Sequence, residues 1–280
     1  MPVTQRHGLA RPASYTETHV PFAGLTLRTH ARFHSRYLPD DRDVTVFLPP
    51  GYDDHPSQHY PVLYLQDGQN LFDPDLAFSK GEHWRVGETA TSLIADERIE
   101  PIIIVGVHNT GKRRLDEYTP TPDKRRGGAE ADAYGRLLAD ELKPFIDATY
   151  RTLADPHYTG LGGSSLGGLV SLYLGLQRPD VFSRLAVISP SVWWDRRAIL
   201  RYVRNAHPKP RLRVWLDIGT AEGRQHVTNL RLLRTAMVKA GWTEGEDLHY
   251  EEIEGAAHTE RAWADRFGRV LEFLYGPAVR

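Results

Sequence analysis

Gly162-Gly163-Ser164-Ser165-Leu166-Gly167-Gly168 is the most informative segment of this 280-residue chain. A frame centred on Ser165 matches G-x-S-x-G, the sharp strand-to-helix turn that exposes a nucleophilic serine above a parallel sheet. A frame centred on Ser164 would need glycine in place of Leu166, so Ser165 is the candidate nucleophile. The motif predicts covalent acyl chemistry, although five residues alone also fit an ordinary glycine-rich loop.

The segments on either side of the motif have the composition that a serine elbow requires. Residues 158–161 are predicted to form a short buried strand, and residues 169–176 are apolar enough for a buried helix. Strand, turn and helix therefore follow in the expected order.

A histidine must accept the serine proton, and in folds with this elbow the chain order is serine, acid, histidine. Four of the 13 histidines follow the candidate serine, namely His207, His226, His249 and His258. His258 follows a strand-like segment, residues 248–253, and the sites of open α/β sheets form on loops at the carboxyl ends of strands. His249 lies inside that segment, and the other two have loop or helix-surface surroundings. We predict that His258 is the general base.

The acid of the triad is expected on a strand-end loop as well. Residues 213–218 are predicted to form a buried strand, and the turn after it carries Glu222. Asp217 is the rival, but inside a strand its side chain would point to one face of the sheet. Glu222 and His226 have a spacing that occurs in metal-binding pairs, but no third ligand accompanies them. We therefore predict Glu222 as the acid and expect no metal.

Composition and charge narrow the class of protein. With 40% hydrophobic residues, the chain is expected to form one domain over residues 1–280, with residues 1–17 as an extended N-terminal segment. Lys plus Arg (35) and Asp plus Glu (36) nearly balance, which predicts neither nucleic acid nor a membrane as partner. The absence of cysteine excludes disulfides, thiolate metal sites and a cysteine nucleophile. Residues 1–13 lack the apolar core of a signal peptide, so we expect a cytoplasmic protein.

Strand and helix patterns alternate along the chain. Residues 60–65 and 101–107 are continuous apolar runs, typical of strands covered on both faces. Further strands are predicted within 18–48, at 43–48 most clearly, and at 185–188, and helices at 86–94, 129–149, 228–239 and 260–275. No internal repeat is present. The predicted fold is α/β, with a mainly parallel central sheet and helices on both faces.

Several stretches resemble the Putative esterase family of α/β-hydrolases, which includes esterase D, siderophore trilactone esterases, feruloyl and acetyl-xylan esterases, and mycolyltransferases. The stretches are residues 65–72, 114–120, 162–168, 189–194 and 219–222, together with His258 and Trp263. The resemblance covers most of the chain. It implies an α/β-hydrolase fold, a small-molecule ester substrate, no cofactor, and a triad of Ser165, His258 and Glu222.

The resemblance also implies the position of the oxyanion hole. One donor is the backbone N–H of Leu166, directly after the nucleophile, and the other is that of Gln69, after Asp67 and Gly68. Loss of one such donor typically lowers the rate by about a hundredfold or more. Without the resemblance, residues 67–70 would fit an ordinary polar turn.

Two segments are expected to shape the substrate pocket. Residues 109–128 carry six basic side chains, a pattern that fits an anionic or polyhydroxyl substrate and also fits a solvated surface loop. Two tryptophans follow a strand end, where one indole suits an aromatic acyl group and the other belongs to the core. The predicted substrate contacts are Asp67, Gly68, Arg114, Trp193 and Trp194.

The predicted function is a serine carboxylic-ester hydrolase that forms an acyl-enzyme and acts on siderophore-like or feruloyl-type esters. Two alternatives stay open at this point. An acyltransferase would pass the acyl group to a sugar or alcohol hydroxyl, and a binding protein would keep the fold without catalysis. The sequence does not choose among ester substrates or indicate an oligomeric state.

Overall fold

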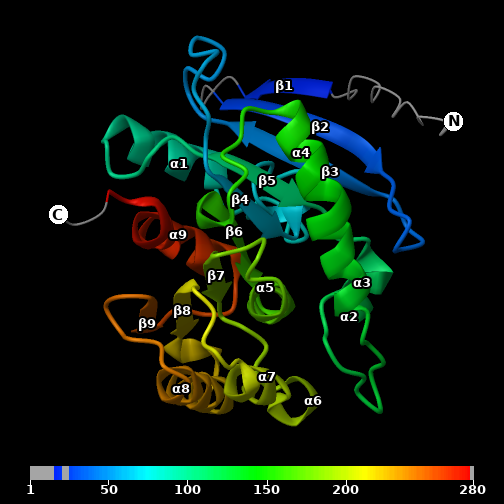
Figure 1. The fold of residues 1–280 in the computed structure, drawn as a ribbon, viewed down its shortest axis with the longest axis vertical. Coiled ribbons are helices and arrows are strands. Elements are labelled where there is room, and N and C mark those ends of the chain that lie inside the picture. The colour runs from blue at the N-terminus through cyan, green and yellow to red at the C-terminus, as the bar shows by residue number, and fades with distance from the viewer. Residues whose placement is uncertain (1–15, 21–24, 278–280) are drawn as a thin grey trace, which may run out of the picture.

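A computed structural model describes residues 16–20 and 25–277 of the chain. Within these residues, nine strands form one sheet in the order β1-β2-β3-β5-β4-β6-β7-β8-β9 (Figure 1). The strands are β1 Thr16–Val20, β2 Leu25–Phe33, β3 Arg42–Leu48, β4 Val62–Gln66, β5 Ile103–Val107, β6 Thr159–Ser164, β7 Arg184–Ile188, β8 Arg213–Gly219 and β9 Leu248–Ile253. β1, β2, β3 and β5 pair antiparallel, whereas β5, β4 and β6 to β9 pair parallel. The predicted mainly parallel sheet is confirmed.

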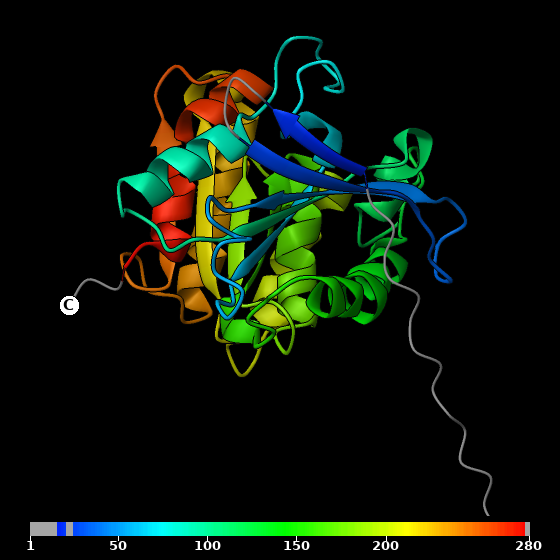
Figure 2. The same ribbon diagram turned by 90° about the horizontal axis from the view of Figure 1, so that it is seen from above.

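Helices cover both faces of this sheet, as predicted. Figure 2, which looks from above, shows the sheet between the two helical layers. On one face lie α1 Val86–Ala95 and α9 Glu260–Tyr275, whose apolar side chains share a core cluster with the sheet. The other face has a larger core cluster and carries α3 Ala131–Arg136, α4 Lys143–Thr149, α5 Leu166–Gln177, α7 Ile199–Asn205 and α8 Arg224–Lys239. Burial on both faces explains why β4 and β5 have continuous apolar sequences.

Several helical segments differ from the sequence prediction. Residues 129–149 form α3, a π-helical segment Leu137–Leu142 and then α4, not one regular helix. α8 begins at Arg224, four residues before the predicted start, directly after Gly223 with its positive φ of 108°. The short helices α6 Trp194–Arg197 and α7 were not predicted, because so few residues show no clear helical period.

The predicted extended segment, residues 1–17, is described only in part. Residues 1–15 of the predicted extended segment lie outside the described residues, while Thr16 and Glu17 belong to β1. Among the helices of the described part of the chain, none is long and apolar enough to cross a membrane.

A buried ion pair ties β3 to the short helix α2 Arg114–Glu117, in the segment that follows β5. Arg42 Nη1 and Nη2 each donate to one carboxylate oxygen of Glu117 over 3.0 Å, and both side chains are 0% exposed. The Arg42 guanidinium also lies over the ring of Tyr134, 5.3 Å from its centroid. Removal of one partner from such a pair leaves an uncompensated buried charge.

The variant Glu117→Gln is therefore expected to lower the free energy of unfolding by about 3–5 kcal/mol, measured by urea denaturation. A matched control is Asp265→Asn, which removes the ion pair with Arg85, whose side chains are 59% and 54% exposed. The control should lose about 1 kcal/mol or less. Equal losses in the two variants would contradict the importance of the buried pair.

Candidate active site

Ser165 lies at the sharp turn between β6 and α5. Its backbone has φ 58° and ψ −121°, a conformation that residues other than glycine rarely adopt. Two hydrogen bonds hold the turn on the carboxyl end of β7: Ser165 N donates to Ile188 O over 3.1 Å, and Ser191 N donates to Ser165 O over 2.9 Å. This strained strand-to-helix geometry is typical of a nucleophile elbow.

The elbow packs directly against the end of β4. A Cβ atom at Gly163 would lie 2.9 Å from Gln66 Cβ, so only glycine permits this approach. Leu166 is the first residue of α5, and the first N–H groups of a helix have no intrahelical acceptor. Gln69 lies just beyond β4 in the 3₁₀ turn Gly68–Asn70, and its side-chain Oε1 accepts from Asn109 N over 3.2 Å. The two predicted oxyanion donors, Leu166 and Gln69, therefore lie on adjacent segments, the elbow and the turn that follows β4.

Asp67 and Arg114 hold the loop that carries Gln69. Asp67 has a left-handed backbone with φ 58°, and its two carboxylate oxygens accept from Arg114 Nε and Nη2, each over 2.7 Å. Asn109 Nδ2 donates to the same carboxylate over 2.7 Å. Burial opposes the charge of Arg114, but Asp67 outweighs it and holds the pKa of Arg114 above its usual value. The Arg114 guanidinium, which was predicted to contact substrate, is therefore engaged in an ion pair with Asp67.

Glu222 and His258 meet at the carboxyl ends of β8 and β9. His258 Nδ1 lies 2.6 Å from Glu222 Oε2, and the other oxygen, Oε1, accepts from Gly219 N over 2.9 Å and from Ser189 Oγ over 2.5 Å. The Glu222 side chain is 2% exposed and that of His258 is 44% exposed. The imidazole stands edge-on to the indole of Trp263, with ring centroids 4.8 Å apart.

Backbone contacts between two loops bring this acid and histidine together. Ala221 N donates to Ala256 O over 3.1 Å, and Gly255 N donates to Thr220 Oγ1 over 2.9 Å. A Cβ atom at Gly219 would lie 2.0 Å from Ala256 O, so the end of β8 must be glycine for the loops to touch. The histidine position is thereby fixed relative to β8.

Burial alone would raise the pKa of Glu222. Hydrogen bonds from His258, Ser189 and the Gly219 N–H outweigh that effect and hold the pKa of Glu222 below its ordinary value. The carboxylate is therefore ionised at neutral pH and accepts a hydrogen bond from the N–H group at His258 Nδ1. This leaves Nε2 of the imidazole as the nitrogen that can accept a proton.

Asp217, the rival acid, does not reach His258. Its carboxylate is 0% exposed and accepts from Arg266 Nε and Nη2, over 3.1 and 3.0 Å, and from Trp215 Nε1 over 2.6 Å. The other candidate histidine of β9, His249, stacks on the same Trp215 ring at 3.9 Å. Both side chains therefore have structural partners away from the serine.

Ser165, Glu222 and His258 all line one cavity of about 570 Å³. The remaining residues of its wall are Arg126, Ser189, Pro190, Ser191, Trp193, Gln225 and His226. Among the described residues, Ser165 Oγ has one hydrogen-bond partner, Ser191 Oγ at 3.3 Å, and His258 is not bonded to it. Hydrogen bonds between a catalytic base and nucleophile are often long until the substrate is bound.

Of the five residues predicted to bind substrate, Trp193 alone lines this cavity. Trp194 is buried, and its Nε1 donates to Thr121 O over 2.8 Å. Arg126 of the basic loop does reach the cavity, with its guanidinium 4.9 Å from the Trp193 ring centroid. The cavity wall also includes His226, for which the sequence predicted a loop or helix-surface position, and Gln225, which was not predicted as a site residue. The signal that would have found them is their position directly after the Glu222 turn.

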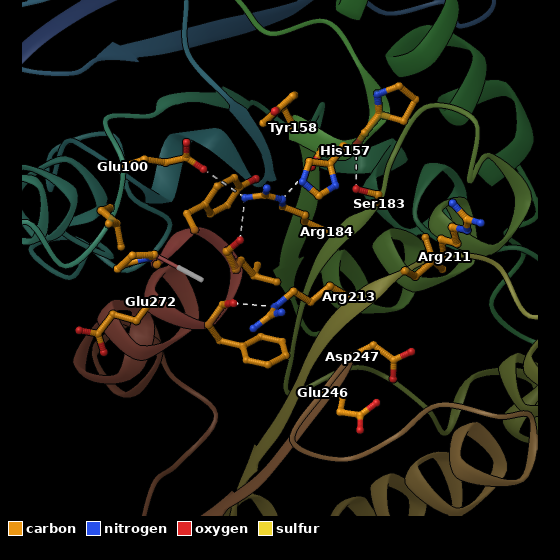
Figure 3. A pocket seen from close by; sticks show the side chains of 18 of the residues that line it. Glu100, His157, Tyr158, Ser183, Arg184, Arg211, Arg213, Glu246, Asp247 and Glu272 are labelled. Atoms are coloured by element: carbon orange, nitrogen blue, oxygen red, sulfur yellow. Dashed lines mark hydrogen bonds and ion pairs between the residues drawn. The ribbon is translucent and has the colours of Figure 1, made fainter. Parts of the chain in front are cut away.

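A larger cavity, about 1660 Å³, lies at the opposite, amino-terminal edge of the parallel strands (Figure 3). It contains a serine and a histidine, but Ser183 Oγ donates to Pro156 O over 2.7 Å. Arg184 donates to two main-chain oxygens, His157 O and Leu274 O, each over 2.8 Å. These groups serve the packing of the strand starts, and the elbow lies at the other end of the sheet.

Comparison with known proteins identifies the family. The model of the Putative esterase family matches residues 35–274, most of the chain. The chain belongs to this family. It is a carboxylic ester hydrolase with an α/β-hydrolase fold, and the predicted resemblance is confirmed.

Relatives of this esterase come from several bacteria. It is 29% identical over 255 residues to the uncharacterized protein YbbA of Bacillus subtilis, covering 86% of this chain and 96% of YbbA. It is 26% identical over 238 residues to an endo-1,4-beta-xylanase/feruloyl esterase of Xylanibacter ruminicola, covering 83% of this chain and 29% of that protein. It is also 29% identical over 180 residues to the ferri-bacillibactin esterase BesA of Bacillus subtilis, covering 58% of each chain.

Solved structures show the same fold. A ferulic acid esterase superposes with a TM-score of 0.71 at 21% identity, covering 90% of this esterase and 98% of that chain. The BES protein from Bacillus cereus superposes with a TM-score of 0.68 at 20% identity, covering 99% and 100% of the two chains.

Substitution of the two carboxylates separates their roles. Glu222→Gln is expected to lower kcat by on the order of 100-fold or more while the protein stays folded, because the imidazole loses the carboxylate that orients it. Asp217→Asn should lower kcat less but reduce the free energy of unfolding by about 3 kcal/mol, because Arg266 loses its buried counter-charge. Steady-state kinetics and urea denaturation on both variants test this. The opposite ranking of kcat would transfer the acid role to Asp217.

Proposed function

We propose that this esterase hydrolyses carboxylic esters by a Ser165–His258–Glu222 triad, through an acyl-enzyme on Ser165. The observation that carries the proposal is the 2.6 Å contact between His258 Nδ1 and Glu222, in the cavity that Ser165 also lines. A carboxylate that fixes one tautomer of a histidine next to an elbow serine is the arrangement that activates a hydroxyl as nucleophile.

In the first step, His258 Nε2 takes the proton of Ser165 Oγ while the oxygen attacks the ester carbonyl carbon. The resulting oxyanion would be stabilised by the N–H groups of Leu166 and Gln69. The tetrahedral intermediate collapses, the bond to the alcohol oxygen breaks, and the alcohol leaves with the proton from His258. The acyl group is then bound to Ser165.

In the second step, water replaces the alcohol. His258 Nε2 takes a proton from the water, whose oxygen attacks the acyl carbon, and the bond to Ser165 Oγ then breaks. The serine recovers its proton from His258 and the carboxylic acid is released. Glu222 stays ionised throughout and stabilises the imidazolium formed in each step.

For the substrate, we propose an ester with an aromatic acyl group. An indole face, Trp193, lines the cavity together with the guanidinium of Arg126, and such a pair suits a planar ring with an anionic or polar substituent. The relatives named as feruloyl and ferri-bacillibactin esterases support this class. Arg126 replaces Arg114 as the basic side chain that we expect to face the substrate.

The nucleophile can be identified by covalent labelling. A fluorophosphonate probe should label the wild-type protein and fail to label Ser165→Ala, because the probe reacts with an activated serine hydroxyl. Ser164→Ala is the matched control, since the neighbouring side chain is buried at the end of β6, and it should keep the label. A wild-type protein that never reacts, or a label that persists in Ser165→Ala, would refute the mechanism.

The role of Arg126 can be tested with a pair of aromatic esters that differ only in charge. Arg126→Gln should raise KM for the anionic ester by about 5-fold, as expected for loss of a partly exposed charge pair, and leave the neutral ester unchanged. Arg125→Gln, at the neighbouring exposed position outside the cavity wall, is the control. Equal effects on both esters would reject a charge-selective role.

A further inference from the structure

Ser189, directly after β7, lies behind the acid of the proposed triad. The residue is 2% exposed and has a positive φ of 42°, which is strained for a residue with a side chain. Its Oγ is within hydrogen-bond distance of three side chains: Glu222 Oε1 at 2.5 Å, Arg266 Nη2 at 2.7 Å and Trp263 Nε1 at 3.1 Å. A buried hydroxyl with three polar partners has few ways to orient its one proton.

The chemistry of the partners fixes that proton. An indole N–H and a guanidinium can only donate, so Trp263 and Arg266 occupy the acceptor positions of the Ser189 hydroxyl. The hydroxyl proton is then left for the one acceptor in reach, Glu222 Oε1. The direction of this hydrogen bond is therefore determined by the two donors on α9.

A buried ion pair holds the guanidinium in place. Arg266 is 2% exposed; its Nε and Nη2 donate to Asp217, and its Nη1 donates to Ala262 O over 2.9 Å. Asp217 also accepts from Ser189 N over 3.2 Å, so the backbone and the side chain of Ser189 are held by one pair. The fully buried Asp217 therefore holds both Ser189 and the arginine that contacts it.

The polar and charged groups that face Glu222 complete the arrangement. The Gly219 N–H comes from the end of β8, His258 from the β9–α9 loop, and Arg266 from α9, with its Nη2 3.8 Å from Glu222 Oε1. Asp217 in β8 balances the arginine. Glu222 Oε1 is thus held by Gly219 N and Ser189 Oγ, and Oε2 is left to accept from His258 Nδ1.

We propose that Ser189, oriented by Arg266 and Trp263, is a positioning residue that aims the Glu222 carboxylate and through it selects the His258 tautomer with Nε2 open to Ser165. The proposal rests on the proposed triad. Without the Ser189 hydroxyl, Glu222 would lose one of its two hydrogen bonds from behind and could turn away from the histidine.

Two variants at the same position separate positioning from stability. Ser189→Ala and Ser189→Gly both remove the hydroxyl, but glycine also relieves the strained φ and should therefore resist a higher urea concentration than alanine. We expect kcat to fall by about 10- to 100-fold in both, the range for loss of one hydrogen bond to a charged group, with little change in KM. A merely structural role predicts instead that kcat recovers in the more stable glycine variant.

A matched control makes the comparison specific. Ser183→Ala removes a partly buried hydroxyl hydrogen bond, to Pro156 O at the far edge of the sheet, and should leave kcat unchanged.

A substrate-free measurement distinguishes the failure of this proposal from the failure of the proposed function. The proton on His258 Nδ1, observed by NMR, should change its chemical shift in both Ser189 variants and keep it in Ser183→Ala. An active wild type, with kcat and the Nδ1 resonance unchanged in the Ser189 variants, would overturn the positioning role alone. A wild type that hydrolyses no ester and reacts with no fluorophosphonate would overturn the triad itself.

Discussion

The hydrogen bond between His258 Nδ1 and the Glu222 carboxylate is the interaction on which the site depends. It is possible because the loops after β8 and β9 touch at Gly219, and because the carboxylate is kept ionised despite its burial. Once the Nδ1 position is taken by the acid, the other imidazole nitrogen is the one left for the serine. The sheet supplies the rest of the geometry, since β6, β8 and β9 end at the same edge.

Two ion pairs support this edge of the sheet, one partly buried and one fully buried. Arg114 with Asp67 fixes the loop that carries Gln69, and Arg266 with Asp217 lies behind the acid. In both pairs, a charged side chain near the site is turned inward and neutralised by a partner from a different element. Such pairs cost desolvation free energy, so their value here lies in geometry more than in stability. Of the arginines and lysines in the described residues, Arg126 is the one that lines the cavity.

Much of the fold could be predicted from local pattern. A few adjacent residues are enough to predict β4 and β5 from their apolar runs, and the elbow from the glycines around Ser165. The interior contacts could not be predicted in the same way. Arg114 appears in the sequence as one of six basic residues in a loop. No local pattern shows that it forms an ion pair with Asp67, 47 positions away.

The same limit applies to the groups behind the acid and to the tryptophans. Arg266 looks like a polar residue of an amphipathic helix, yet it is buried against Asp217, 49 positions earlier. Trp193 and Trp194 are adjacent, and only the packing of the following short helix decides that Trp194 enters the core. Long-range pairing, not residue type, determines these roles.

Trapping the covalent intermediate tests the Ser165 acyl-enzyme directly. The protein is mixed with an activated aromatic ester, quenched in acid during turnover, digested and mapped by mass spectrometry. We expect the acyl mass on the peptide that contains Ser165, and on its hydroxyl. Ester hydrolysis with no acylated peptide, or with the acyl group on another residue, would contradict it.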